Sequence, residues 1–510
     1  MAGSRNAAPG PPTEPGAADA SAVEAQVSDT LDWFAHPAAR EVRVELAEAR
    51  ARLSAFSALP VSINQFHRIL DLFQGRADTV ATAINALLRD AGQPLAPDLL
   101  LLAQHLDHLE SQICDGYLRV IKDIEHRFVR SRRRDPSSVA ARALKAARER
   151  LEIAAYSAQA APRELWAQIH HLYRVSRANQ LPPEAAADAG RIYREMLAFA
   201  AIQPERLSGQ EVAGAADYLG RFATAVMLFD TPPTTADFRM FWVDPALDSA
   251  PVALARKLPP AGDEVVYFSC TRLGTLAAEH LRELEAGTDP AQLRLPPEAA
   301  KPAYRGLLRK LHETWAEPPT RHLVRRGHSY PVRMCIGLAA LARLFDSQCG
   351  DDAELATQSE WTVLNESPSG FALVHATGDI GGVQTGEAVA IRAADNKPWD
   401  ICIVRWVRNE PPDTVEIGLQ ILASSAQTVR LAFRHTPAPQ PTVTALRLPA
   451  LRALRAHDAI LAPSGTVISQ RFVMVAEDER THVAQGRVVN LDLQTACVEL
   501  FQFQDDPYPL

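Results

Sequence analysis

Residues 361–373 read Trp-Thr-Val-Leu-Asn-Glu-Ser-Pro-Ser-Gly-Phe-Ala-Leu, a polar corner between two apolar runs. The corner holds a carboxamide (Asn365), a hydroxyl (Ser367) and a glycine (Gly370) at fixed offsets. Asn, Ser and Gly are ordinary turn residues, because they hydrogen-bond to nearby backbone or tolerate unusual backbone angles. At the end of a strand pair the same groups also lie where a ligand can reach them. The stretch therefore predicts a hairpin whose turn is a candidate binding corner.

Short apolar runs lie on both sides of this corner. Glycine or proline separates most of them, and several alternate with a period of two, such as the run containing Val389 and Ile391. One helical pattern, at 337–345, interrupts the series. Evenly spaced short strands of this kind predict a small antiparallel β-barrel. The runs occupy residues 330–336, 361–364, 371–375, 387–392, 401–408 and 415–422.

This part of the chain resembles the PilZ domain family, small β-barrels that bind the bacterial second messenger cyclic di-GMP. The second motif of the family is Asp or Asn, any residue, Ser, two further residues and Gly. Asn365, Ser367 and Gly370 match it at every specified position. The strands that follow also have the order of such a barrel, including a strand with Val-Arg-Trp at 404–406. The resemblance covers residues 319–425 and implies a nucleotide-binding fold there.

The first motif of the family supplies two arginines, four residues apart, on a loop before the first strand. Guanidinium groups pair bidentately with phosphate and stack on guanine, which suits a dianion with two purine faces. A solvated arginine loop without a ligand is the alternative interpretation. Arg321 and Arg325 have the required spacing, and Arg326 is near enough to substitute. The resemblance thus implies a cyclic di-GMP site made of Arg321, Arg325, Arg326, Asn365, Ser367 and Gly370.

The sequence before the barrel predicts helices. Residues 1–28 are rich in Ala, Gly and Pro without periodicity, so we expect a disordered tail. Residues 29–318 have a mostly helical pattern, as in the stripe Val80, Ile84 and Leu88. Ala-rich helices with short breaks predict an all-α bundle or a repeat-like region, in one domain or two subdomains. One short apolar run, 265–268, interrupts this pattern.

The sequence after the barrel predicts one more domain. Residues 431–442 include Thr-Pro-Ala-Pro-Gln-Pro-Thr and have the composition of a linker. Further apolar runs in 443–510 predict a second small β domain. With residues 319–430 as the PilZ-like barrel, we expect a multidomain α+β protein.

Composition excludes several classes of protein. A net charge of -8 over 510 residues, with a pI near 6.0, argues against a general nucleic-acid binder. No window approaches the ~20 apolar residues that span a bilayer. The first residues also lack the apolar core of a signal peptide. The six cysteines are scattered without a Cys-x-x-Cys pair, which is typical of reduced cytosolic thiols. We therefore expect a cytoplasmic protein.

Other motifs carry little chemistry. His105 and His108 lie one helical turn apart, but no third ligand accompanies them, so we expect no metal site. We interpret Trp406 as a core residue and Arg405 as part of a structural ion pair. No spacing supports a catalytic arrangement, so we expect no enzyme and no cofactor.

These observations predict a cytoplasmic receptor or effector of PilZ type that binds cyclic di-GMP and has no catalytic activity. The helical region would be its output or docking module for an unknown protein partner. The alternative is a degenerate PilZ-like adaptor that binds protein partners without nucleotide. The discriminating feature is the arginine loop, namely whether Arg321, Arg325 or Arg326 comes within reach of Ser367.

Overall fold

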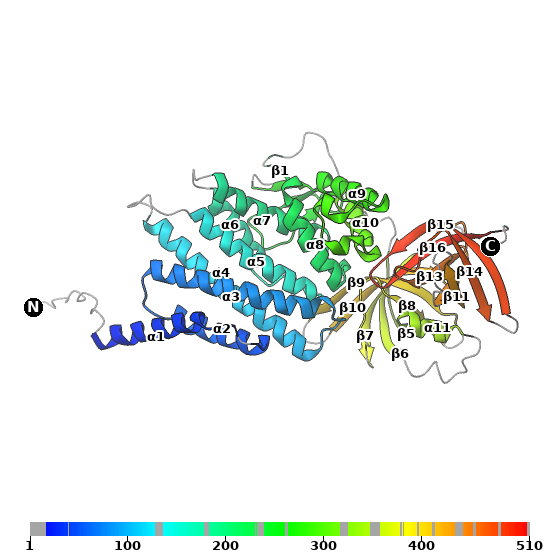
Figure 1. Ribbon diagram of the computed structural model, residues 1–510, viewed down its shortest axis with the longest axis horizontal. Helices are drawn as coiled ribbons and strands as arrows, with labels where there is room; N and C mark the ends of the chain where they lie inside the picture. Colours follow the sequence, from blue (N-terminus) through cyan, green and yellow to red (C-terminus); the bar gives the residue numbers. More distant parts are fainter. Residues whose placement is uncertain are drawn as a thin grey trace, which may run out of the picture.

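The computed structural model places the helices at one end of an elongated molecule, the first barrel in the middle and the second barrel at the far end (Figure 1). It describes residues 17–38, 40–127, 136–177, 183–229, 231, 239–260, 264–316, 325–346, 358–377, 380, 382–394, 397–410, 414–433, 442–451, 455–477 and 481–506.

Ten long helices form the N-terminal region in the described part of the chain. They are α1 (Ala17–Ala35), α2 (Val42–Ser57), α3 (Ile63–Arg89), α4 (Pro97–Arg127), α5 (Pro136–Tyr156), α6 (Leu165–Arg177), α7 (Pro183–Ala201), α8 (Gly209–Phe222), α9 (Thr271–Glu285) and α10 (Pro302–Ala316). Some of them begin with strong caps. At α8, for example, Ser208 Oγ accepts from the Glu211 N–H, and the Glu211 carboxylate accepts from the Ser208 N–H.

The expected disordered tail is wrong for residues 17–28, which belong to α1. The helix is stabilised because Val27 and Trp33 are buried against the other helices. The glycines and prolines that suggested disorder stand mostly before this point, in residues 1–16, which lie outside the described residues.

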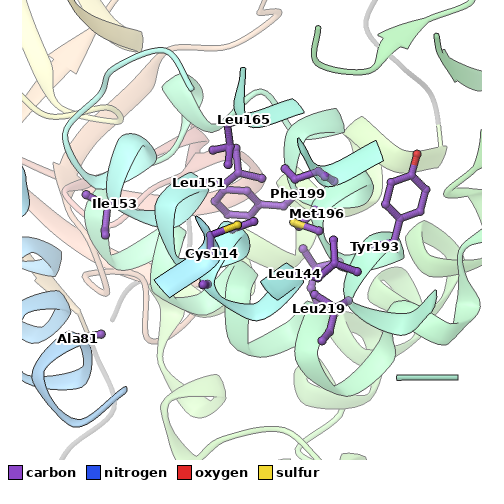
Figure 2. Packing of buried hydrophobic residues seen from close by; sticks show 14 of the residues in the cluster. Ala81, Cys114, Leu144, Leu151, Ile153, Leu165, Tyr193, Met196, Phe199 and Leu219 are labelled. Carbon is purple, nitrogen blue, oxygen red and sulfur yellow. The ribbon is translucent and has the colours of Figure 1, made fainter. Parts of the chain in front are cut away.

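Helix α5 is the centre of the bundle, and α3, α4, α6, α7 and α8 all pack against it. Its alanines let the neighbours approach closely, and Ala140, Ala143 and Ala147 are fully buried. Figure 2 shows Leu144 of α5 and Leu219 of α8 inside this core. The side chains that fill the core come from stripes with helical periodicity, as the sequence predicted.

The helical region also contains a small antiparallel sheet, of which the sequence analysis identified only the run at 265–268. Its order is β1-β4-β2-β3, with β1 (Met227–Phe229), β2 (Met240–Val243), β3 (Val252–Ala253) and β4 (Val266–Ser269). Strands this short give little periodicity, so the sequence does not predict them.

The first barrel is closed, with the strand order β10-β7-β6-β5-β8-β9. Its core includes Trp361, Val363, Leu373 and Ile417. Ala158, from the loop after α5, also enters this cluster. The short helix α11 (Leu338–Leu344) packs on the side that faces the second barrel. The strands are β5 (Arg326–Ile336), β6 (Gln358–Ser367), β7 (Gly370–Thr377), β8 (Ala388–Arg392), β9 (Asp400–Glu410) and β10 (Thr414–Ala423).

The C-terminal β unit is a second closed barrel, ordered β11-β12-β13-β16-β15-β14. The sequence predicts that the first barrel ends at residue 430 and that 431–442 form a linker. The structure instead assigns β11 to the second barrel, because this strand pairs with β12 and β14. The strands are β11 (Gln427–Phe433), β12 (Val443–Leu448), β13 (Ala459–Pro463), β14 (Arg471–Glu477), β15 (Thr481–Gln494) and β16 (Val498–Asp505).

The helical region contacts both barrels through backbone. Gln93 and Val383 exchange two backbone hydrogen bonds, of 3.0 and 2.8 Å. On the other side, a Cβ on Gly306 of α10 would lie 2.4 Å from the carbonyl oxygen of Gln494 in β15. Side chains cannot fit between surfaces this close, so the helices hold both barrels firmly. Within the described segments, no helix is both long and apolar enough to cross a membrane.

Candidate functional site

The polar corner forms the tight hairpin between β6 and β7, where Ser367 pairs with Gly370. The Ser367 hydroxyl lies 3.3 Å from the carbonyl oxygen of Gly370 and 3.4 Å from Ser369 Oγ. Gly370 is required by packing, since a Cβ there would lie 2.0 Å from the carbonyl oxygen of Leu419 in β10. The glycine therefore lets the hairpin lie flat against its neighbouring strand.

Strand β5 brings the arginines beside this hairpin. Gly327 pairs with Asn365 and Arg326 with Glu366, so the start of β5 lies next to the end of β6. Arg325 is exposed, and its Nη1 donates to Asn365 Oδ1 at 3.2 Å. Arg326 is exposed at the first position of the strand. Of the six predicted site residues, the structure thus brings Arg325 and Asn365 into contact, while Arg321 lies outside the described residues.

Three neighbours that the sequence analysis did not name complete the corner. Glu366 Oε2 accepts from the Tyr330 hydroxyl at 2.7 Å, and Glu366 Oε1 lies 3.3 Å from His328 Nε2. Burial raises the pKa of Tyr330, and its hydrogen bond to Glu366 raises that pKa further. Glu366 therefore places a negative charge beside two exposed arginines. Glu366 occupies a position that the six-residue motif leaves unspecified, so the motif gives no indication of this role.

Strand β9 departs from alternation next to this site. Gly418 pairs with Trp406 and Leu419 with Val404, so Arg405 is the extra residue of a β-bulge. Val404 and Val407 both face the barrel core, which leaves Arg405 and Trp406 outside it. The interpretation of Trp406 as a core residue is wrong. Its ring lies against the bare backbone of Gly418, where a Cβ would be 1.8 Å from Trp406 Nε1.

The interpretation of Arg405 as part of an ion pair is also wrong. Among the described residues, no carboxylate lies within ion-pair distance of its guanidinium. Its neighbour Arg408 does form one, 3.5 Å from Glu205, and lies over the Trp406 ring at 5.4 Å. In the same described segments, no three potential metal ligands come together.

Comparison with known proteins agrees with this geometry. Residues 345–428 match the family model described as the middle PilZ domain of the cyclic-di-GMP receptor FimW. The first barrel is a PilZ domain. This confirms the resemblance drawn from Asn365, Ser367 and Gly370. The match begins after β5, so the arginines before the PilZ hairpin lie outside it.

The helical region has a counterpart in the same receptor. Residues 28–233 match the model for the N-terminal domain of the cyclic-di-GMP receptor FimW. The receptor FimW of Pseudomonas aeruginosa is 28% identical over 102 residues, which cover 20% of this chain and 17% of that protein. No solved structure matches the chain. The PilZ domain therefore follows a helical domain of a kind that is also found beside it in another protein.

Proposed function

We propose that this chain is a non-catalytic, cytoplasmic receptor for cyclic di-GMP, with the PilZ domain as its sensor. The observation that carries the proposal is the contact between Arg325 and Asn365. It joins the arginine loop to the motif hairpin, which are the two parts that a cyclic di-GMP site requires. Two matching models named after a cyclic di-GMP receptor support the same ligand.

Each predicted residue then has a role. Arg325 and Arg326 are exposed cations that pair with the phosphates and stack on guanine, and Arg321 stands four residues before Arg325. Asn365 and Ser367 offer hydrogen-bonding groups on the hairpin. Gly370 keeps its backbone close to β10. Ligand binding would draw Arg325 away from Asn365, because a phosphate is a stronger partner for a guanidinium than a neutral carboxamide.

The helical region would respond to this change and would act as an output or docking module for a protein partner. The hairpin strand β7 pairs with β10, and β10 pairs with β9. At the end of β9, Asn409 donates to Gln93 Oε1 and to the carbonyl oxygen of Ser157. A shift at the hairpin thus reaches the helices through three adjacent strands.

Isothermal titration of the full chain with cyclic di-GMP tests this proposal, with guanosine as the control ligand. We expect saturable binding of cyclic di-GMP and much weaker binding of guanosine, which carries one guanine and no phosphate. No heat at high micromolar ligand, with protein shown to be folded by circular dichroism, would overturn the receptor function. In that case capture of a partner independent of nucleotide would support the adaptor.

A further inference from the structure

A cavity of about 560 Å³ lies where the helical region and the two barrels meet. Helix α10 contributes one wall, strands β9 and β10 of the PilZ domain a second, and β15 a third. Its volume lies within the range of sites for small organic ligands. Among the described residues that line it, none belongs to the motif hairpin, and neither Arg325 nor Arg326 is one of them.

The lining is rich in cations. Its charged side chains are Arg206, Arg309, Lys310, Arg405 and Arg455 on the positive side, and Glu313 and Asp492 on the negative side. Lys310 is neutralised, since its Nζ lies 2.7 and 2.8 Å from the carboxylate oxygens of Glu211. Arg309 contacts Glu285 at 3.2 Å. The other three arginines then face Glu313 and Asp492, which leaves an excess of one positive charge among the described lining residues.

Those three arginines lack carboxylate partners within the described segments. Among the described residues, no ion pair or side-chain hydrogen bond involves the guanidinium of Arg206 or Arg405. Arg455 is buried and donates from Nη2 to two carbonyl oxygens, while its buried Nε has no acceptor in the described part of the chain. A buried donor without an acceptor is costly, so a ligand that accepts a hydrogen bond from this Nε would stabilise Arg455.

The electrostatics of the cavity agree with this geometry. Burial lowers the pKa of Arg405, and Glu313 and Glu211 oppose that change only in part. Burial also lowers the pKa of Arg206, and the positive charge of Arg405 lowers it further, while Glu205 and Glu313 oppose this change. Two like charges that line the same cavity thus repel each other in a partly desolvated place. An anion between them would relieve this repulsion.

We propose that this cavity is a second anion-binding site, which takes a small molecule that carries a phosphate group. The β-bulge at Arg405 places its side chain outside the barrel core, on the strand that packs against η1 (Pro204–Arg206), and both Arg405 and Arg206 line the cavity. Guanidinium groups from the helical region and the two barrels then converge on one ligand. The site is independent of the motif hairpin, although Gln420 in its wall pairs with Gly370 of that hairpin.

The experiment measures anion binding to the full chain by isothermal titration and by thermal shift. The probes are inorganic phosphate, pyrophosphate and GMP, which distinguish free phosphate from a nucleotide as the source of the phosphate group. Arg405→Met and Arg206→Met remove one charge each but keep the aliphatic part of the side chain. Arg343→Met, on the exposed face of α11 and outside the cavity, is the matched control.

We expect at least one probe to bind saturably and to raise the melting temperature. Either cavity substitution should weaken that binding by about tenfold or more, whereas Arg343→Met should leave it unchanged. Binding that is equally tight in both cavity variants would overturn the proposal. So would the absence of binding by every probe to the folded wild-type chain. Arg206→Met keeps the test decisive if Arg405→Met fails to fold.

Discussion

Gly370 and Arg325 affect the same hairpin in different ways. Gly370 is needed for backbone packing, because a Cβ there would overlap the carbonyl oxygen of Leu419. Arg325 contributes to the surface of the hairpin, because its exposed guanidinium contacts Asn365 without filling any core position. Substitutions at the two positions should therefore separate folding from binding.

We expect Gly370→Ala to lower the free energy of unfolding by about 1–3 kcal/mol, the usual cost of overpacking. Denaturant unfolding of the full chain measures this change. Gly220→Ala is the control, since Gly220 is exposed on α8 and nothing lies within 4 Å of an added Cβ. The control should be neutral or slightly stabilising. A Gly370→Ala variant as stable as the wild type would contradict the overlap.

We expect Arg325→Ala and Ser367→Ala each to weaken cyclic di-GMP binding by about 1–3 kcal/mol, the range for hydrogen bonds to charged groups. The free energy of unfolding of Arg325→Ala should stay close to that of the wild type, because the side chain is exposed. Titration calorimetry gives the first quantity and denaturant unfolding the second. Unchanged affinity in both variants would remove these residues from the site.

At the residue scale, the sequence predicted the motif but not its surroundings. Asn365, Ser367 and Gly370 were recognisable because a tight hairpin and a short motif are local. The bulge at Arg405 was not, because it depends on how many residues the partner strand places opposite it. Trp406 was misassigned for the same reason, since alternation along β9 stops at the bulge.

At the scale of elements, α5 carries a group of acidic residues into the helical core. The Glu152 side chain is only 13% exposed, and its Oε1 lies 3.3 Å from Arg148 Nε. Arg148 also pairs with the buried Glu195 at 2.9 Å. Burial raises the pKa of Glu152 to about 8, and the charge of Glu149 contributes, although Arg148 opposes the change.

This raised pKa predicts a pH dependence of stability. The folded state holds a proton on Glu152 that the unfolded state releases above the ordinary glutamate pKa. The contribution of Glu152 is therefore most favourable in acid, and is lost as the pH rises toward about 8. Glu152→Gln cannot ionise, so its free energy of unfolding should vary less between about pH 5 and about pH 8.

Denaturant unfolding at several pH values measures this effect. The exposed Glu125 of α4 provides the control, and Glu125→Gln should keep the wild-type pH dependence. A wild-type pH dependence in Glu152→Gln would show that this carboxyl is not the group responsible.

Elements can be predicted from the sequence where apolar residues recur on one face over several helical turns or along a strand. The long helices and most barrel strands follow from such periodicity. The boundary between the two barrels does not follow from periodicity, because only its pairing with β12 and β14 assigns β11 to the second barrel. The packing of strand β9 on both of its faces also does not follow from the sequence. Ile401 and Ile403 face the second barrel while Cys402 and Val404 face inward, so the run reads as evenly apolar.

At the scale of the whole molecule, Asn409 joins the PilZ domain to the helices. Its Nδ2 donates to Gln93 Oε1 at 2.6 Å and to the carbonyl oxygen of Ser157 at 2.9 Å. Its backbone N–H donates to the carbonyl oxygen of Ala158 at 2.8 Å. A single residue thus fixes the loop after α5 against the end of β9.

We expect Asn409→Ala to destabilise this junction by about 1–3 kcal/mol, because two acceptors lose their donor. In this variant, amide hydrogen exchange should be faster around residues 93, 158 and 383 than in the core of the helical region or of the PilZ domain. Thr444→Ala, at an exposed position on β12, is the control and should leave exchange at the junction unchanged. Uniform exchange in the Asn409→Ala variant would contradict its role as a specific link.

The close approach of Gly306 to Gln494 limits how this protein can diverge during evolution. Any residue with a side chain at position 306 would require β15 to move, and β15 forms a wall of the second barrel. Gly386 is constrained similarly, since a Cβ there would lie 2.8 Å from Thr495. We therefore expect that, in homologous chains, substitutions in α10, in the segment before β8 and at the end of β15 occur together. The second barrel and the helices that contact it would then be conserved as a pair.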